Sequence, residues 1–229
     1  MNKRNYILLA IYALLATLYF HVIGQNCESL ICRRFVAVPT LFAVAATTLN
    51  FRRGGWLIPL ALLASAAGDW AGAMGEFIFQ VGFFAVAHLF YIADFAPECK
   101  FTRKRAFALM LFSAAVLPLL GYILSHIESR VELIAVAIYG VIIYTMGVTA
   151  LLQQRKHSML YAVAALFFIF SDSCIAYNKF VEHIPNATLW IMTTYYAAQG
   201  SSAHYIYFAK RVINLPQYFA VSISFYIFV

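Results

Sequence analysis

Two aspartates lie inside stretches that are otherwise almost wholly apolar. Asp69 belongs to LLASAAGDWAGAMG and Asp172 to FFIFSDSCIAYNKF. A carboxylate inside a bilayer costs roughly 2.5–3.5 kcal/mol on insertion scales, so such a residue usually faces the interior of a helix bundle and has a partner. Two carboxyl groups in one low-dielectric pocket could divide general acid and general base work between them. The pair therefore predicts a site.

The residues around Asp69 indicate that its side chain points inward. Ser65, Gly68, Asp69 and Gly72 follow a spacing of i, i+3, i+4 and i+7, which places them on one face of a helix. Small residues on such a face allow a second helix to approach closely. Asp69 is therefore expected on a packed face.

Other polar side chains occur at comparable depths in neighbouring apolar segments. Each of them could do no more than hold helices together, because intramembrane Tyr, Ser and His commonly form hydrogen bonds between helices. Asn178 and Lys179 could simply mark the point where a helix leaves the membrane. Together with the aspartates, these side chains predict a polar pocket open toward one half of the bilayer; the members are Ser65, His88, Tyr91, Ser171, Asn178, Lys179, Tyr195, Tyr196 and Gln199.

The composition fixes the class of protein in which these residues lie. Of 229 residues, 64% are hydrophobic and only 11% are charged, and the mean hydropathy is +0.81. A soluble domain of this size could not cover so much apolar surface. The apolar runs are unbroken rather than alternating, which favours helices over barrel strands. We therefore expect an all-α, polytopic membrane protein of the cell (inner) membrane, and the net charge of +7 needs no nucleic-acid partner.

Eight segments are each near the ~20 residues that a spanning helix requires. The short, charged connections between them leave no room for a second domain, so we expect one bundle over residues 1–211. Residues 212–229 form an apolar tail, expected at the interface or poorly ordered. The predicted spans are 5–23, 34–50, 56–74, 77–95, 106–125, 132–152, 158–177 and 187–208.

The basic residues predict the orientation of this bundle. With a cytoplasmic N-terminus, twelve of the 16 lysines and arginines fall on the inside. The outer side then holds only Arg33, Arg34, Arg130 and Lys179. Because cytoplasmic loops carry the excess of Lys and Arg, both termini are expected in the cytoplasm.

The four cysteines carry little information. Cys27 and Cys32 share the first outer loop and either form a small disulfide or remain two ordinary thiols. No pair has a spacing typical of a metal site, and we expect neither a metal nor a cofactor.

Several of these segments together resemble the YhhN family of membrane proteins, which includes animal lysoplasmalogenases. The resemblance is carried by SAAGDWAGAMGEFIFQVGFFAVAHLFY, FIFSDSCIAYNKF and TYYAAQ, in that order, and extends from about Arg33 to Lys210. Family members often show a Lys-Pro pair at the entry of the second span, whereas this chain has CRRFVAVP. A cation is kept at that place, but the proline lies further along.

The resemblance implies hydrolysis of the vinyl ether bond of lysoplasmalogens, which releases a fatty aldehyde and a glycerophospho-alcohol. It therefore implies a lysolipid partner. Asp69 and Asp172 would be the acid/base pair, and which of them donates the proton stays open. His88, Tyr195, Tyr196 and Gln199 would position water or the ether oxygen. Lys179, Arg33 and Arg34 would meet the phosphate group.

Two alternatives remain at the level of the sequence. The first is a small transporter whose intramembrane acids bind a proton or cation, weakly favoured because Asp69 and Asp172 lie about 103 residues apart in segments of the same direction. The second is a lipid-binding or structural membrane protein without turnover. The sequence does not indicate an oligomeric state.

Overall fold

The computed structural model of the chain describes residues 3–24, 34–49 and 55–208, with side chains described to residue 21 in the first range and to residue 203 in the last. The possible disulfide between Cys27 and Cys32, the cation Arg33 and the apolar tail 212–229 lie outside the described residues.

The described part of the chain is all-α, as predicted. Its helices coincide with the eight predicted segments to within a few residues at each end, and a short 3-10 turn, η1 (Ala96–Glu98), follows the fourth. The helices are α1 (Lys3–Gly24), α3 (Ala37–Thr48), α5 (Leu57–Ala73), α6 (Phe77–Phe95), α7 (Arg103–Leu124), α8 (Arg130–Leu152), α9 (Ser158–Phe180) and α10 (Ala187–Phe208).

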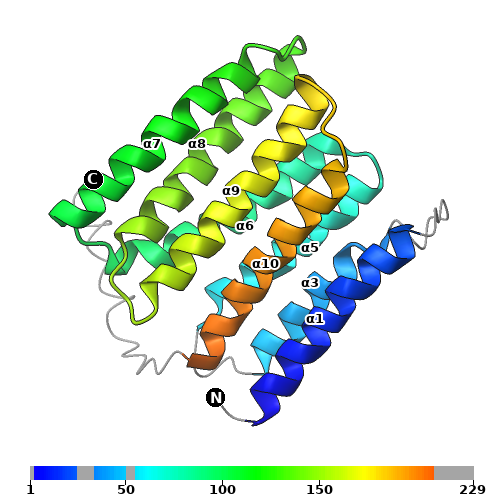
Figure 1. Cartoon of the computed structure of the whole chain (residues 1–229), viewed down its shortest axis with the longest axis vertical. Helices are drawn as coiled ribbons and strands as arrows, with labels where there is room; N and C mark the ends of the chain where they lie inside the picture. Colours follow the sequence, from blue (N-terminus) through cyan, green and yellow to red (C-terminus); the bar gives the residue numbers. More distant parts are fainter. Residues whose placement is uncertain (1–2, 25–33, 50–54, 209–229) are drawn as a thin grey trace, which may run out of the picture.

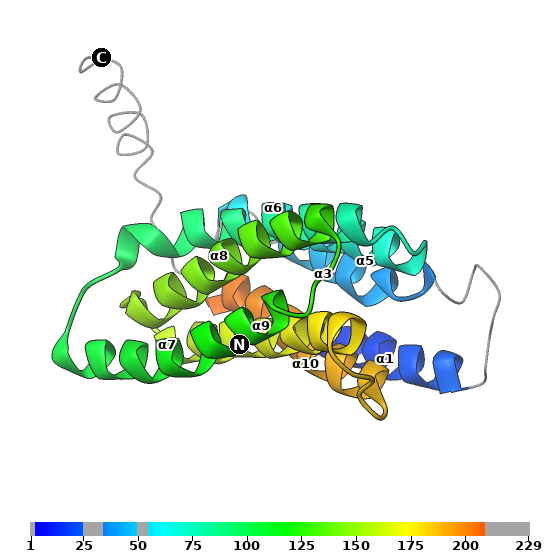
Figure 2. The same ribbon diagram turned by 90° about the horizontal axis from the view of Figure 1, so that it is seen from above.

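The helices run roughly alongside one another (Figure 1). Seen from above, α3, α5 and α6 lie along one side, and α1, α10, α9 and α7 lie along the other (Figure 2). Helix α5 packs mainly against α6 and α3, α10 packs against α9, and α8 contacts both α6 and α9. Helix α1 packs mainly against α3 and α10, at the edge of the bundle.

Four of these helices are long and apolar enough to cross a membrane by length and composition. They are Phe77–Glu98 (α6 with η1), α7, α8 and α9, whereas α3 and α5 are shorter apolar helices. That all eight segments span the bilayer, with both termini in the cytoplasm, stays a prediction.

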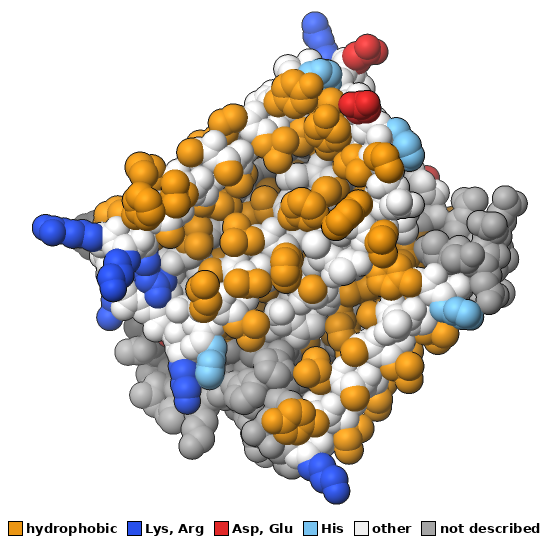
Figure 3. All heavy atoms as spheres, viewed as in Figure 1, with side chains coloured by type: hydrophobic (Ala, Val, Ile, Leu, Met, Phe, Trp, Pro, Cys, Tyr) orange, Lys and Arg blue, Asp and Glu red, His pale blue; other side chains and the backbone are white. Residues whose placement is uncertain are grey.

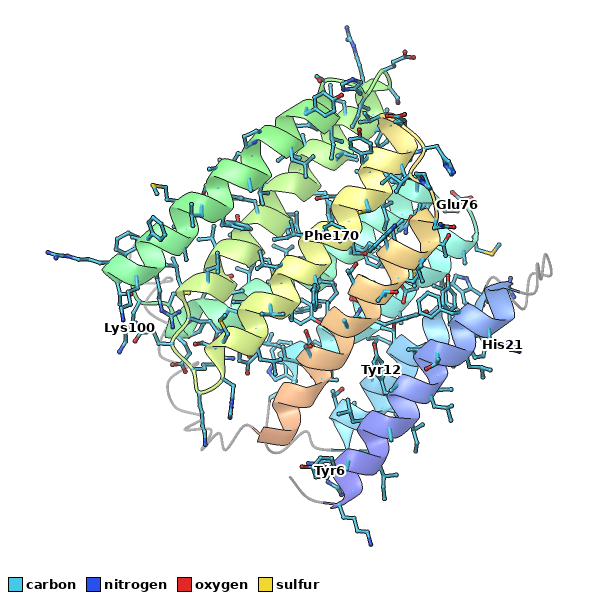
Figure 4. The ribbon with its side chains drawn as sticks, viewed as in Figure 1. Tyr6, Tyr12, His21, Glu76, Lys100 and Phe170 are labelled. Atoms are coloured by element: carbon cyan, nitrogen blue, oxygen red, sulfur yellow. The ribbon has the colours of Figure 1, made fainter. Side chains whose placement is uncertain are left out.

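The charged side chains lie mainly near the ends of the helices. Hydrophobic side chains cover most of the face in Figure 3, and its Lys and Arg side chains gather mainly at the lower left ends of the helices. Figure 4 places Tyr6 and Lys100 at that end and His21 and Glu76 at the opposite end. The start of α1 and the end of α6 with η1 therefore lie at the same end of the bundle.

Local sequence signals define several helix ends. Ser129 precedes α8, and its hydroxyl accepts a hydrogen bond from the Glu132 amide, as expected of an N-cap. Thr102 does the same for α7 through the Arg105 amide. The Arg105 guanidinium in turn donates to the backbone oxygens of Leu151 and Gln153 at the end of α8, where carbonyl groups lack partners within the helix.

The predicted small-residue face of α5 is confirmed as a helix contact. A Cβ atom on Gly68 would lie 2.6 Å from the ring of Phe84, and one on Gly72 would lie 2.6 Å from the Gln80 side chain. Both neighbours belong to α6, which therefore packs directly against the glycines. This close approach fixes α6, and with it His88, beside the helix that carries Asp69.

Candidate active site

Asp69 lies on α5, inside the bundle, and is 5% exposed. The Thr40 hydroxyl, on α3, donates a hydrogen bond of 2.9 Å to Asp69 Oδ2. The Tyr195 hydroxyl, on α10, faces the same carboxyl group. Three helices therefore meet at Asp69, and its inward orientation agrees with the prediction from the sequence.

Asp172 lies on α9 and is 9% exposed. Its Oδ2 accepts a hydrogen bond from the hydroxyl of Tyr139 on α8. His88 Nε2, on α6, lies 3.4 Å from the same oxygen and 3.0 Å from the Tyr139 hydroxyl. Asp172, Tyr139 and His88 thus form a compact buried group.

One aromatic ring connects the side chains around Asp69 with those around Asp172. It belongs to Phe168, one turn before Asp172 on α9. Its centroid is 5.5 Å from that of His88 and 6.1 Å from that of Tyr195, so an aromatic wall joins the two groups.

A line of amide and hydroxyl groups extends from Asp69 along α10. Gln199 Nε2 donates to the Tyr195 hydroxyl at 2.8 Å, and the Tyr91 hydroxyl lies 3.4 Å from Gln199 Oε1. Tyr195 and Gln199 lie one helical turn apart, and this hydrogen bond joins them. Ser202, one turn further, is also buried.

Two polar atoms in this region lack a partner among the described residues. They are His88 Nδ1 and Ser171 Oγ, both buried. A buried polar group without a hydrogen bond costs about 1–3 kcal/mol, which favours their use by a ligand. Ser65 is also buried, one turn before Asp69 on α5.

Three predicted site residues make contacts of a different kind. Asn178 Oδ1 accepts a hydrogen bond of 2.8 Å from the Ile184 amide and so holds the turn after α9. Lys179 forms a 3.2 Å ion pair with Glu132. Tyr196 points away from Gln199, and its hydroxyl donates to the Val36 oxygen at 2.8 Å.

The cation Arg34 lies close to the Asp69 segment. Its guanidinium carbon is 4.4 Å from the centroid of the Trp70 ring, as in a cation–π contact. Arg34 is therefore next to the residue that follows Asp69 in the chain.

Sequence reasoning missed Tyr139 and Thr40, the direct donors to the two aspartates. Tyr139 is a single hydroxyl within an apolar segment, and Thr40 follows Pro39 among alanines and valines. In the sequence, each is a lone polar residue near the middle of an apolar segment. Such residues are also typical of ordinary contacts between helices.

These buried side chains are suited to acid/base chemistry. They include two carboxyl groups, one imidazole and several hydroxyl donors, which together can transfer protons and stabilise a positive charge. Within the described ranges, no group of three or more His, Cys, Asp or Glu side chains could hold a metal ion.

The chain is similar to known proteins over the part that contains these site residues. A family model described as YhhN family matches residues 31–201. The lysoplasmalogenase TMEM86B of Rattus norvegicus is 34% identical over 181 residues, which are 76% of this chain and 68% of that protein. A lysoplasmalogenase of Mycobacterium bovis is 32% identical over 184 residues, covering 77% and 70%. The chain matches no solved structure.

Proposed function

Because the chain belongs to the YhhN family, we propose that it is a membrane-embedded hydrolase that cleaves the vinyl ether bond of lysoplasmalogens or a closely related lysolipid. The products are a fatty aldehyde and a glycerophospho-alcohol. One observation carries this proposal: two carboxyl groups on different helices are both buried inside the bundle, each with a hydrogen-bond donor from another helix. The relatives named lysoplasmalogenase support the choice of substrate.

Vinyl ether hydrolysis requires two proton-transferring groups. A general acid first protonates the β-carbon of the double bond, which leaves an oxocarbenium ion at the carbon attached to oxygen. Water then adds to that carbon and loses a proton to a general base, giving a hemiacetal. Glycosidases divide related chemistry between two carboxyl groups, since their transition states also resemble an oxocarbenium ion.

We assign the acid role to Asp69 and the base role to Asp172. His88 is the one imidazole in contact with either carboxyl group among the described residues, and it contacts Asp172. An imidazole can exchange protons with Asp172 during the reaction, whereas Thr40 and Tyr195 offer Asp69 only hydroxyl groups.

The cycle closes without a net change in either residue. Asp69 gives its proton to the β-carbon, and Asp172 takes one from the attacking water. In the second half, the hemiacetal hydroxyl returns a proton to Asp69 while Asp172 protonates the departing glycerol oxygen, and the carbon–oxygen bond breaks. One water molecule is consumed per aldehyde released.

The test is aldehyde release from a lysoplasmalogen by the purified protein in detergent or lipid. Asp69→Asn and Asp172→Asn should each lower the rate at least about a hundredfold, because each loses a general acid or base. Glu132→Gln is the matched control, since Glu132 pairs with Lys179 at a helix end. It should retain the wild-type rate.

Size-exclusion profiles and helical content should remain unchanged in all three variants. Full activity in both aspartate variants would exclude the acid/base assignment. Uptake of a solute or proton into vesicles without lipid cleavage would favour the carrier alternative instead.

A further inference from the structure

An apolar groove separates α1 from α10 on the outside of the bundle. It has a volume of about 530 Å³ and includes one residue of α9, Leu160. Figure 3 shows this face, with hydrophobic side chains along both helices. Its walls include Leu9, Ala13, Ala16 and Phe20 of α1 and Ala197 and Gly200 of α10.

Two tyrosines form the part of the wall nearest to the bundle interior. Figure 4 shows Tyr12 on α1, toward the neighbouring helices. Its hydroxyl donates to the Tyr196 backbone oxygen at 2.7 Å, and the Tyr196 hydroxyl is occupied by the Val36 oxygen. Because both hydroxyls are used inside the protein, these residues offer mainly ring surface to the groove.

Gly200 allows this arrangement. A Cβ atom at this position would lie 2.8 Å from Cε1 of Tyr12, so only glycine lets the ring rest against α10. A larger residue would push Tyr12, and with it α1, away from the bundle.

The groove and the candidate site are separated by one layer of side chains. Tyr195 and Tyr196 are consecutive on α10, and their ring centroids are 5.6 Å apart. Tyr195 faces Asp69, whereas Tyr196 faces the groove.

We propose that this groove binds the single hydrocarbon chain of the lysolipid substrate, with the vinyl ether end turned past Tyr12 and Tyr196 toward Asp69. The inference rests on the proposed function. The volume lies in the range of pockets that hold one small ligand, which suits one chain rather than two. A lysolipid moves within the bilayer, so an apolar groove on the outside of the bundle lets its chain enter without leaving the lipid.

A photo-crosslinking experiment tests the location of the chain without turnover. The probe is a lysophosphocholine with a saturated 1-O-alkyl chain, which lacks the double bond needed for protonation, and with a diazirine at the chain end. Peptide mapping of the full-length protein should place the cross-links on α1 and α10 residues of the groove. Cross-links confined to other helices would overturn the proposal.

Filling the groove tests its link to the reaction. Ala13→Trp and Ala197→Trp should each reduce cross-linking and lower kcat/KM for lysoplasmalogen by about tenfold or more, because a displaced chain misplaces the reacting carbon. Leu14→Trp is the matched control: Leu14 is 66% exposed on α1 and does not line the groove. It should behave as wild type.

The outcomes separate the two proposals. Normal cross-linking and normal kcat/KM in both groove variants would overturn the proposal that the groove binds the lipid chain. The proposed function would stand in that case, because the wild-type protein would still release aldehyde. Groove cross-links in a protein that releases no aldehyde would overturn the proposed function and leave a site for a single-chain lipid.

Discussion

The hydroxyl of Tyr139 on α8 donates a hydrogen bond to Oδ2 of Asp172 on α9. Because His88 of α6 contacts both groups, three helices converge on one carboxylate. Asp69 has an equivalent position among α3, α5 and α10. Each carboxyl group is thus held by donors from helices other than its own. These donors limit the rotation of the aspartate side chain.

Tyr139→Phe should lower the rate of aldehyde release by roughly ten- to a hundredfold. The change removes one hydroxyl and leaves Asp172 with one donor fewer in a buried place, where a lost charged hydrogen bond costs about 1.5–3 kcal/mol. Tyr144→Phe is the control on the same helix, because the Tyr144 hydroxyl contacts Ser113 at 2.8 Å. Equal rates for the two variants would contradict the role of Tyr139.

His88→Ala should lower kcat more than it changes KM, because the imidazole acts on Asp172 during the reaction rather than on the lipid chain. The cavity left by the ring should admit free imidazole, and added imidazole should restore part of the rate. A purely structural role for His88 would give no such rescue, and the measurement is aldehyde release with and without imidazole.

Gly68→Ala should destabilise the protein by about 1–3 kcal/mol, as overpacking commonly does, because the new Cβ would meet the Phe84 ring at 2.6 Å. Gly82→Ala on α6 provides the comparison, since nothing lies within 4 Å of its Cβ position. Thermal unfolding in detergent should show a lower midpoint for Gly68→Ala alone. Similar midpoints would show that α5 and α6 can move apart.

Asp94→Leu should destabilise the protein far more than Glu132→Gln. Asp94 is 1% exposed and pairs with Arg155, and breaking a buried pair costs about 3–5 kcal/mol because the other charge is left without its counter-ion. The Glu132–Lys179 pair is partly exposed, and such pairs contribute about 0–1 kcal/mol. Thermal unfolding compares the two, and equal midpoints would contradict the importance of the buried pair.

Reporter fusions should place both termini in the cytoplasm. A fluorescent protein at either end should fluoresce, whereas alkaline phosphatase inserted in the turn between α7 and α8 should be active, because that turn is expected outside. Phosphatase activity at the C-terminus, together with a fluorescent fusion at the N-terminus, would show an odd number of spans.

The helices themselves were largely predictable. Long apolar runs separated by charged turns can satisfy their backbone groups within a membrane only as helices, so the eight predicted segments coincide with observed helices. The inward face of α5 was also predictable, because Gly68 and Gly72 share the 3.6-residue period with Asp69. Periodicity reports which side of a helix is packed, but not which helix packs there.

The sequence by itself therefore determined the all-α class, the helix positions and the burial of Asp69, since these depend on local hydrophobicity and spacing. Only the tertiary structure shows that Thr40 donates a hydrogen bond to Asp69 and that Tyr139 and His88 contact Asp172. The same holds for the ion pair between Lys179 and Glu132. Such partners come from different helices, far apart in the chain. Their choice depends on how helices rotate and pack against one another, and that is decided only when the whole bundle has formed.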